Sequence, residues 1–249
     1  MLIRDTPAGG VEVFVMRRNL GAAFAAGMFV FPGGRVDDAD GGPAIEPFVH
    51  GMDDTTASAL LGIEAGGLAF WVAAIRECFE ESGLLLARTR SGDPPPGADG
   101  EREAVHRGEL SMIELCRRYD LVLDAGPMRY VAHWVTPVGE LPRRFDTRFF
   151  LAVAPTGQEG AHDDGETVDS RWVRPTDALL DAEQGRLMMM PPTVANVRFL
   201  QGCADAADAL AKADAAGPPV RIQPRVRRGA DGAIVGFAMP DDADYDALA

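Results

Sequence analysis

The pattern of apolar and polar positions predicts a chain of mixed strands and helices. Residues 11–16 (Val-Glu-Val-Phe-Val-Met) alternate and are rich in β-branched side chains, which predicts a strand. Residues 68–87 instead place their apolar side chains at helical spacing. Further strands are expected over 27–31, 128–136, 148–153 and 170–173, further helices over 109–119, 176–183 and 191–215, and a closing hairpin over 220–226 and 233–239. Residues 43–65 show little periodicity, and 91–100, with three prolines and three glycines, are expected to form a loop. This mixture is typical of a layered α/β domain.

The length and composition fit one domain over residues 1–240, followed by a flexible acidic tail over 241–249. No apolar run approaches the roughly 20 residues that a membrane-spanning helix needs. The three cysteines show no short-range pairing pattern, from which we expect a reducing, cytoplasmic setting. The net charge of −14 argues against broad binding to nucleic acids or anionic membranes.

The run from Arg76 to Leu84 (Arg-Glu-Cys-Phe-Glu-Glu-Ser-Gly-Leu) is the candidate for chemistry. On a helix it brings Glu77, Glu80 and Glu81 close together, and like charges at this spacing are destabilising. A bound divalent cation removes that repulsion, and carboxylate oxygens are ligands that Mg²⁺ accepts. A solvated acidic face is the alternative for such a run taken alone.

A glycine corner, Phe31-Pro32-Gly33-Gly34, ends the expected strand over 27–31, and Asp40 follows it. Together with the acidic run, this corner resembles the Nudix box of the Nudix hydrolases, G-x5-E-x7-R-E-U-x-E-E-x-G-U with U aliphatic. Asp40 stands where the family has glutamate, and Cys78 where it has an aliphatic residue. Between Asp40 and Arg76 lie 35 residues where the pattern has seven.

The box is therefore interpreted as split by an insertion at about residues 41–67. A rival alignment starting at Gly62 has the right distance to Arg76 but puts Leu68 at the acid position. A split box resembles the branch of the family that includes the peroxisomal coenzyme A diphosphatases of animals. Segments at 27–34, 133–137, 143–150 and 191–192 also resemble that branch. Residues 22 and 26 are alanine where the coenzyme A signature has arginine and glycine.

The resemblance implies a Nudix fold, a mixed β-sheet sandwiched between helices (α/β/α), with a C-terminal helix and hairpin. It implies Mg²⁺ or Mn²⁺ as cofactor. The metal ligands it implies are Glu77, Glu80, Glu81 and the carbonyl of Gly33. Arg76 is expected to join the catalytic set by a salt bridge to Asp40 or Glu80.

Two questions about the site residues stay open in the sequence. The proton acceptor is either a box acid, Glu77 or Glu80, or the distal acid Glu166. Candidates for substrate binding are the corner residues and several arginines, which suit phosphate groups. They are Arg17, Arg18, Phe31, Gly34 and Arg144, with Arg143 and Arg148 as neighbours.

The leading function that the resemblance implies is cleavage of the diphosphate of coenzyme A or acyl-CoA, giving 3′,5′-ADP and (acyl-)4′-phosphopantetheine. Two alternatives are a Nudix pyrophosphatase acting on ADP-ribose, dinucleotides or capped RNA, and a Nudix module that senses a nucleotide without hydrolysing it. The intact acids argue against the sensor. The insertion is expected either to cover the site or to form the contact of a homodimer.

Overall fold

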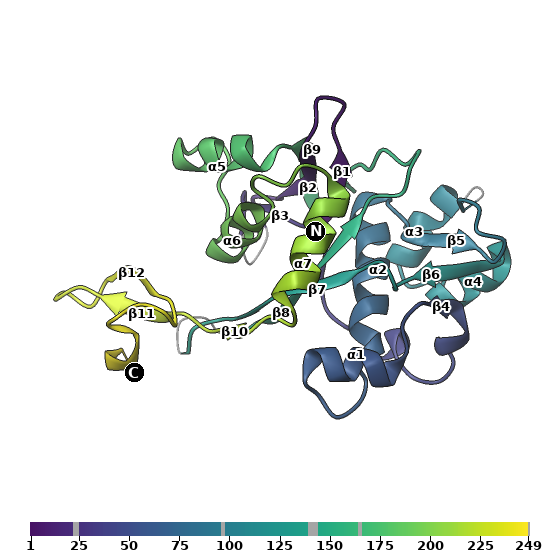
Figure 1. Cartoon of the computed structure of the whole chain (residues 1–249), viewed down its shortest axis with the longest axis horizontal. Helices are drawn as coiled ribbons and strands as arrows, with labels where there is room; N and C mark the ends of the chain where they lie inside the picture. Colours follow the sequence, from purple (N-terminus) through teal and green to yellow (C-terminus); the bar gives the residue numbers. More distant parts are fainter. Residues whose placement is uncertain (22–24, 96–97, 139–143, 164–165, 249) are drawn as a thin grey trace.

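The computed structural model describes residues 1–21, 25–95, 98–138, 144–163 and 166–248. Its largest element is a seven-stranded sheet with the order β10-β7-β8-β1-β2-β3, in which β9 also pairs with β2 (Figure 1). The strands are β1 (Leu2–Asp5), β2 (Val11–Arg18), β3 (Phe29–Val30), β7 (Arg129–Val135), β8 (Asp146–Val153), β9 (Thr167–Val173) and β10 (Arg221–Ile222). The sheet is mixed, because β1–β8 and β10–β7 are parallel pairs whereas the other pairs are antiparallel.

The alternation along β2 explains why helices cover both faces of this sheet. Phe14 and Met16 belong to one hydrophobic core, and Val13 and Val15 belong to a second, because successive side chains of a strand point to opposite faces. The first core includes side chains of α2, and the second includes side chains of α5, α6 and α7. These helices are α2 (Leu68–Ser82), α5 (Pro175–Glu183), α6 (Pro191–Phe199) and α7 (Ala206–Ala216). The predicted α/β/α arrangement is confirmed.

The insertion is more regular than its sequence suggests. It forms α1 (Asp54–Leu61), which begins where the Asp53 side chain accepts a hydrogen bond from the Thr56 amide and ends at Gly62. It also adds a strand to a second, three-stranded sheet of order β4-β6-β5. The remaining elements around this sheet are β4 (Val49–His50), β5 (Ala87–Thr89), β6 (Leu121–Asp124), α3 (Arg102–His106), α4 (Met112–Tyr119), η1 (Asp38–Asp40), η2 (Glu46–Phe48) and η3 (Ala98–Glu101).

One predicted helix ends earlier than expected, and another is interrupted. The helix predicted over 68–87 ends at Ser82, because Gly83 adopts the left-handed conformation (φ 73°), and residues 87–89 form β5. The helix predicted over 191–215 is two helices. Gly202 (φ 81°) lies in the break, and the Asp205 side chain caps α7 by accepting a hydrogen bond from the Asp208 amide.

The C-terminal hairpin is present as β11 (Arg225–Arg228) and β12 (Ile234–Ala238), and it projects from the rest of the molecule (Figure 1). Residues 221–222, predicted as part of the hairpin, instead pair with β7. Where the sequence predicts a flexible tail, Arg227 pairs with Asp242 and Asp244, and η4 (Tyr245–Ala247) follows. Among the described residues, no helix has the length and apolar character of a membrane span.

Candidate active site

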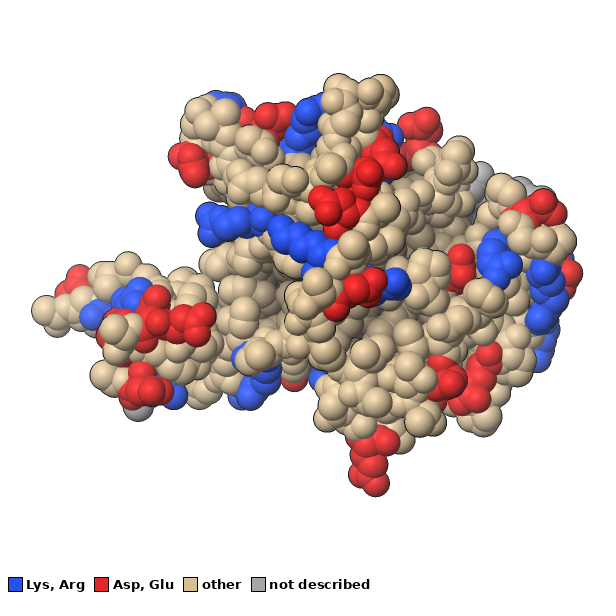
Figure 2. All heavy atoms as spheres, in the orientation of Figure 1, with Lys and Arg blue, Asp and Glu red and all other residues tan. Residues whose placement is uncertain are grey.

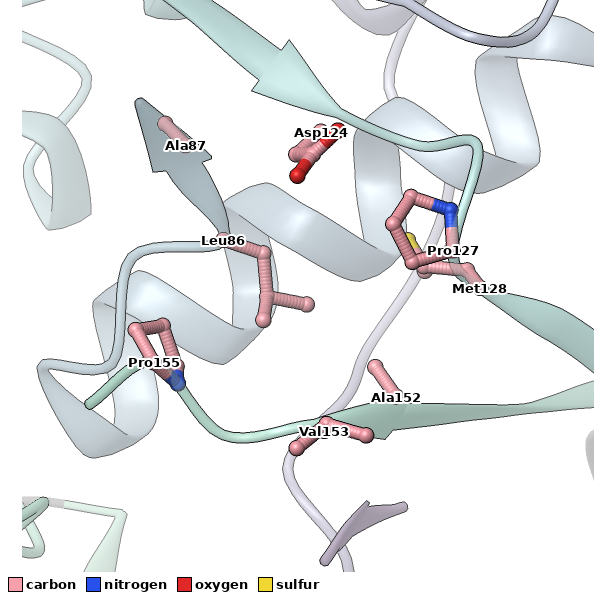
Figure 3. Close-up of a pocket in the computed structure, with 8 residues that line it drawn as sticks. All are labelled: Leu86, Ala87, Asp124, Pro127, Met128, Ala152, Val153 and Pro155. Carbon is pink, nitrogen blue, oxygen red and sulfur yellow. The ribbon is translucent and has the colours of Figure 1, made fainter. Parts of the chain in front are cut away.

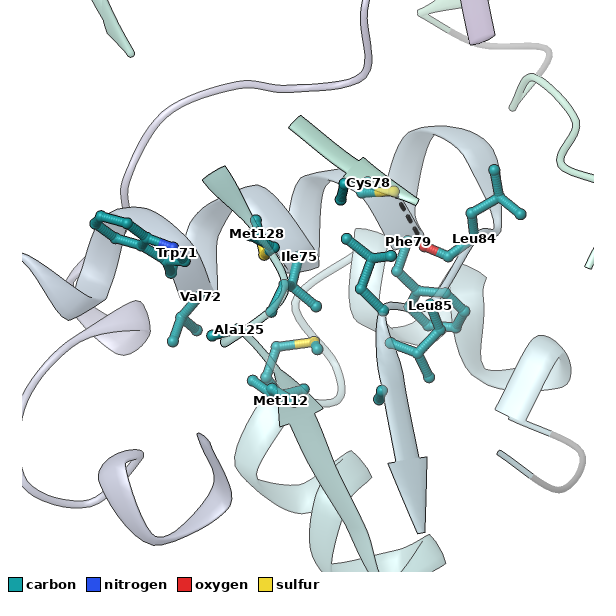
Figure 4. Close-up of a cluster of buried hydrophobic side chains, with 14 of the residues drawn as sticks. Trp71, Val72, Ile75, Cys78, Phe79, Leu84, Leu85, Met112, Ala125 and Met128 are labelled. Atoms are coloured by element: carbon teal, nitrogen blue, oxygen red, sulfur yellow. Dashed lines mark hydrogen bonds between the residues drawn. The ribbon is translucent and has the colours of Figure 1, made fainter. Parts of the chain in front are cut away.

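The acidic run lies on the C-terminal half of α2, which is held in place by its apolar side. Trp71, Val72, Ile75 and Phe79 are completely buried in the first core (Figure 4). Cys78, at the aliphatic position of the box, is also buried, and its thiol donates a hydrogen bond to the carbonyl of Leu84. Burial raises the pKa of this thiol to about 11, so Cys78 is a packing residue and not a reactive thiolate.

The glycine corner lies directly against the acidic helix. The Gly33 amide donates a hydrogen bond of 2.8 Å to Oε2 of Glu81. A Cβ added to Gly34 would lie 2.5–2.6 Å from the carboxylate atoms of Glu77, so a larger residue there would push that carboxylate aside. The two halves of the split box therefore meet in the folded chain.

Arg76 joins these halves through charge-assisted hydrogen bonds. Its Nε and Nη2 donate to the two carboxylate oxygens of Asp40 at 2.8 and 2.9 Å, and its Nη1 donates to Glu77 at 3.0 Å and Glu80 at 3.1 Å. Asp40 is only 1% exposed. Both predicted partners of Arg76 are confirmed. The alignment through Gly62 is wrong, because Gly33 and Gly34 contact the box acids, whereas Gly62 is the C-cap of α1.

Burial makes the box acids difficult to ionise. It raises the pKa of Glu81 to about 8, although the hydrogen bond from the Gly33 amide acts in the opposite direction. Burial also raises the pKa values of Glu77 and Glu80, against the opposing effect of Arg76. A site where three carboxylates are desolvated favours a bound cation, which replaces the lost water.

The chemistry of these side chains fits Mg²⁺ or Mn²⁺, since both are bound through oxygen. The described residues contain no ready group of three metal-ligating side chains, because Glu77 and Glu80 turn to Arg76 and Glu81 turns to Gly33. Joint coordination therefore requires these side chains to rotate from their present partners towards an ion.

The comparisons with known proteins agree with this geometry. A family model described as the NUDT19 Nudix domain matches residues 4–200. The chain belongs to the Nudix hydrolase family. The crystal structure of a NUDIX hydrolase from Alicyclobacillus acidocaldarius is 30% identical and has a TM-score of 0.69, covering 84% of this chain and 92% of that one.

Curated relatives of this Nudix hydrolase include proteins named acyl-coenzyme A diphosphatase NUDT19. The protein from Homo sapiens is 28% identical over 242 residues, which cover 82% of this chain and 64% of the relative. The protein from Xenopus laevis is 28% identical over 217 residues, covering 73% and 57%. The chain thus spans less than two thirds of the length of these relatives.

The predicted substrate residue Arg18, on β2, and the candidate distal acid Glu166, just before β9, both lie near the box acid Glu81 of the Nudix hydrolase. Arg18 Nη2 lies 3.9 Å from Glu166 Oε2, and the carbonyl of Glu166 accepts a hydrogen bond from the Asn19 amide. The charge of Glu166 contributes to the raised pKa of Glu81, which indicates that the two acids are neighbours. The Nε of Arg18 is buried without a hydrogen-bond partner in the described part of the chain.

For the other predicted substrate residues Phe31, Arg17 and Arg144, no contact with the box acids is seen among the described residues. Phe31 is 7% exposed and packs in the second core with its ring edge-on to Phe149, so it supports the corner from behind. Arg17 is exposed on β2, and Arg144 is exposed ahead of β8. Position 143 lies outside the described residues.

Arg148 and His133 belong to a separate cluster on β7 and β8. Arg148 stacks over the ring of Phe70 at 4.4 Å and pairs with Asp146, which also pairs with His133 at 2.6 Å. His133 is 9% exposed. This cluster holds the start of α2 against the sheet, whereas the box acids lie on its last turns.

Sequence reasoning missed α3, which contacts Glu80 from outside the box. Arg102 Nε donates to the carbonyl oxygen of Glu80 at 2.9 Å, and His106 Nδ1 lies 3.9 Å from the Glu80 carboxylate. No motif could have pointed to these residues, because α3 is five residues long and follows a segment rich in proline and glycine.

A pocket of about 140 Å³ lies between the residues after α2 and the end of β8 (Figure 3). Asp124 is its one charged lining residue, and Leu86, Met128 and Val153 are among the apolar ones. None of the box acids lines it, so we place the chemistry at the glycine corner and not in this pocket.

Proposed function

We propose that this Nudix hydrolase is a metal-dependent diphosphatase whose substrate is coenzyme A or an acyl-CoA. The products are 3′,5′-ADP and 4′-phosphopantetheine or its acyl form. The observation that carries the proposal is the bidentate bridge from Arg76 to Asp40, which rebuilds the box across the insertion. The relatives named acyl-coenzyme A diphosphatase support the choice of substrate.

Each box residue has a separate part in this proposal. The carboxylates of Glu77, Glu80 and Glu81, with the carbonyl of Gly33, hold Mg²⁺ or Mn²⁺. The bound ion supplies neutralisation of phosphate oxygens and a water of lowered pKa. Arg76 does not need to touch the substrate, since Asp40 and the carbonyl of Arg35 occupy its Nε and Nη2 donors.

Proton transfer is assigned to a box acid or Glu166, and phosphate binding is assigned to Arg18. Glu77, Glu80 or Glu166 accepts the proton of the attacking water. Replacement of Glu166 by glutamine separates it from the two box acids, because Glu166 is not among the proposed metal ligands. Arg18 binds a phosphate oxygen, because its guanidinium is a cation near the box acid Glu81 and suits phosphate geometry.

The proposal also includes a cytoplasmic setting and a homodimer. The three cysteines are free and buried, as suits a reducing compartment. Light scattering on the purified chain tests the dimer.

The substrate is tested by incubating the pure protein with Mg²⁺ and a panel of coenzyme A, acetyl-CoA, NADH, ADP-ribose, dNTPs and capped RNA, with products separated by chromatography. Coenzyme A or acetyl-CoA is expected to be cleaved with the highest kcat/KM. Faster cleavage of any other member contradicts the substrate assignment and favours the broader pyrophosphatase reading. Replacement of both Glu80 and Glu81 by glutamine is expected to abolish turnover while the fold survives.

A further inference from the structure

Arg102, on α3, links three segments that the box alone does not connect. Its Nε donates to the carbonyl of Glu80 at 2.9 Å, and its Nη1 donates to the carbonyl of His162 at 3.5 Å. The guanidinium also lies beside Gly83, where an added Cβ would be 3.5 Å from Nη1. These contacts join the last turn of α2, its glycine cap and the segment that leads from β8 to β9.

The end of α2 depends on partners from outside the helix. The last carbonyls of a helix have no partner within it, and a positive charge near them is favourable. The last turn of α2 has no basic residue, so Arg102 supplies this charge from α3. The carbonyl of Ser82 is bound by the Ala161 amide at 2.8 Å.

The β8–β9 segment is fastened to the same helix end. The side chain of Gln158 accepts a hydrogen bond from the Leu85 amide at 2.8 Å and donates one to the Leu85 carbonyl at 3.3 Å. The Ala161 amide and the His162 carbonyl then bind the helix end and Arg102, and the carboxylate of the next residue, Asp163, accepts a hydrogen bond from the Glu166 amide at 3.1 Å. The position of Glu166 relative to the box acids therefore depends on this attachment as well as on the hydrogen bond from the Asn19 amide to the Glu166 carbonyl.

We propose that Arg102 is a positioning residue of the candidate active site. It fixes the box helix, which carries Glu80 and Glu81, relative to the segment that carries Glu166. This inference rests on the proposed function, because it assigns the reaction to groups on both sides of Arg102. Residues that support ligands and catalytic groups in this way commonly change activity by about 10- to 100-fold when they are removed.

The kinetic test compares R102A with R107A. Arg107 caps the same short helix but is exposed and pairs with the side chains of Glu103 and Glu109, so it is the matched control. R102A is expected to lower kcat by about 10- to 100-fold with KM changed by less than about threefold, whereas R107A leaves both unchanged. R102K retains a charged donor for the Glu80 carbonyl and is expected to recover part of kcat. Loss of thermal stability in R102A with kcat unchanged per folded molecule contradicts the proposal.

A second measurement does not depend on turnover. The amide of Ala161, which binds the Ser82 carbonyl, is expected to exchange its hydrogen about tenfold faster in R102A than in the wild type or in R107A. An unchanged exchange rate at Ala161 overturns the assignment of Arg102. A wild type that cleaves no member of the panel contradicts the proposed function instead, and the exchange rate then shows separately whether Arg102 holds the segment.

Discussion

Arg76 organises the candidate site at the scale of single residues. Its guanidinium reaches Asp40, Glu77, Glu80 and the carbonyl of Arg35, so one side chain sets the positions of three acids. Asp40 is one methylene shorter than the family's glutamate, yet it still forms the bidentate contact, because the short helix η1 brings it to the arginine. The sequence predicted this bridge from the resemblance, and the spacing alone could not, since 35 residues separate the partners.

Removal of the Asp40 charge is expected to destabilise the chain. Asp40→Asn leaves Arg76, which is 12% exposed, without its closest anionic partner, and breaking a buried pair in this way costs about 3 kcal/mol. Urea denaturation followed by circular dichroism measures the change. Asp38→Asn, at an exposed position of the same turn, is the control. A D40N protein as stable as D38N would show that the bridge does not hold the two halves of the box together.

Glu81 is expected to make the stability of the metal-free protein depend on pH. Its pKa is about 8 in the folded chain against an ordinary value of 4.5, so the folded state holds a proton that the unfolded state has lost. The contribution of Glu81 to the free energy of unfolding is therefore fully present below pH 4.5, its ordinary pKa, and is lost as the pH rises towards 8. Glu81→Gln removes this loss. In excess chelator, melting curves at pH 8 are expected to show E81Q more stable than the wild type, and the opposite order contradicts the raised pKa.

At the scale of elements, the site forms where the glycine corner meets α2. The corner supplies backbone groups, and α2 supplies the carboxylates that lie against them. The pattern of apolar residues predicted α2, which has a long, regular buried side, whereas the Pro-Gly-Gly turn predicted the corner. The apolar pattern did not predict β1, whose four residues are too few to show a period, nor the break between α6 and α7, which depends on Gly202 and the Asp205 cap. The contribution of Arg102 was also hidden, because it acts on backbone carbonyls and leaves no spacing in the sequence.

A single methyl group at the corner is expected to separate folding from activity. In Gly34→Ala the new Cβ would meet the carboxylate of Glu77, the flexible end of a side chain that can move away. Turnover is therefore expected to fall by about tenfold or more while the melting temperature changes little. Gly100→Ala is the matched control, since nothing lies within 4 Å of a Cβ there. Equal activity in the two variants would show that the position of Glu77 is unimportant.

At the scale of the whole molecule, the two cores on either face of the large sheet carry the site, and the C-terminal hairpin stands apart. Among the described residues, neither core includes one beyond Ala213. Acidic and basic side chains are interspersed on the face shown in Figure 2, and the net charge of −14 repels a diphosphate in general. Arg18 and the bound cation are the local sources of attraction in the proposed mechanism.

Removal of the hairpin is expected to leave the rest of the chain folded and active. A chain that ends at Ile222 keeps β10 and loses β11, β12 and the tail. Arg227 and the tail acids with which it pairs are removed together, so no partner is left unpaired. Its melting temperature is expected to stay within about 4 °C of the full chain, with kcat/KM unchanged. Unfolding or inactivity of the truncated chain would show that the hairpin contributes to the core or to the site.

The role of the three glutamates in metal binding is tested most directly by anomalous diffraction from crystals of the full chain soaked with Mn²⁺ and coenzyme A. We expect manganese peaks at carboxylate oxygens of Glu77, Glu80 and Glu81, with at least one of the first two turned from Arg76 to the ion. The diphosphate is expected beside Gly33 and Gly34. Manganese bound elsewhere, or box acids that keep their present partners while the diphosphate lies in another part of the molecule, would contradict the account.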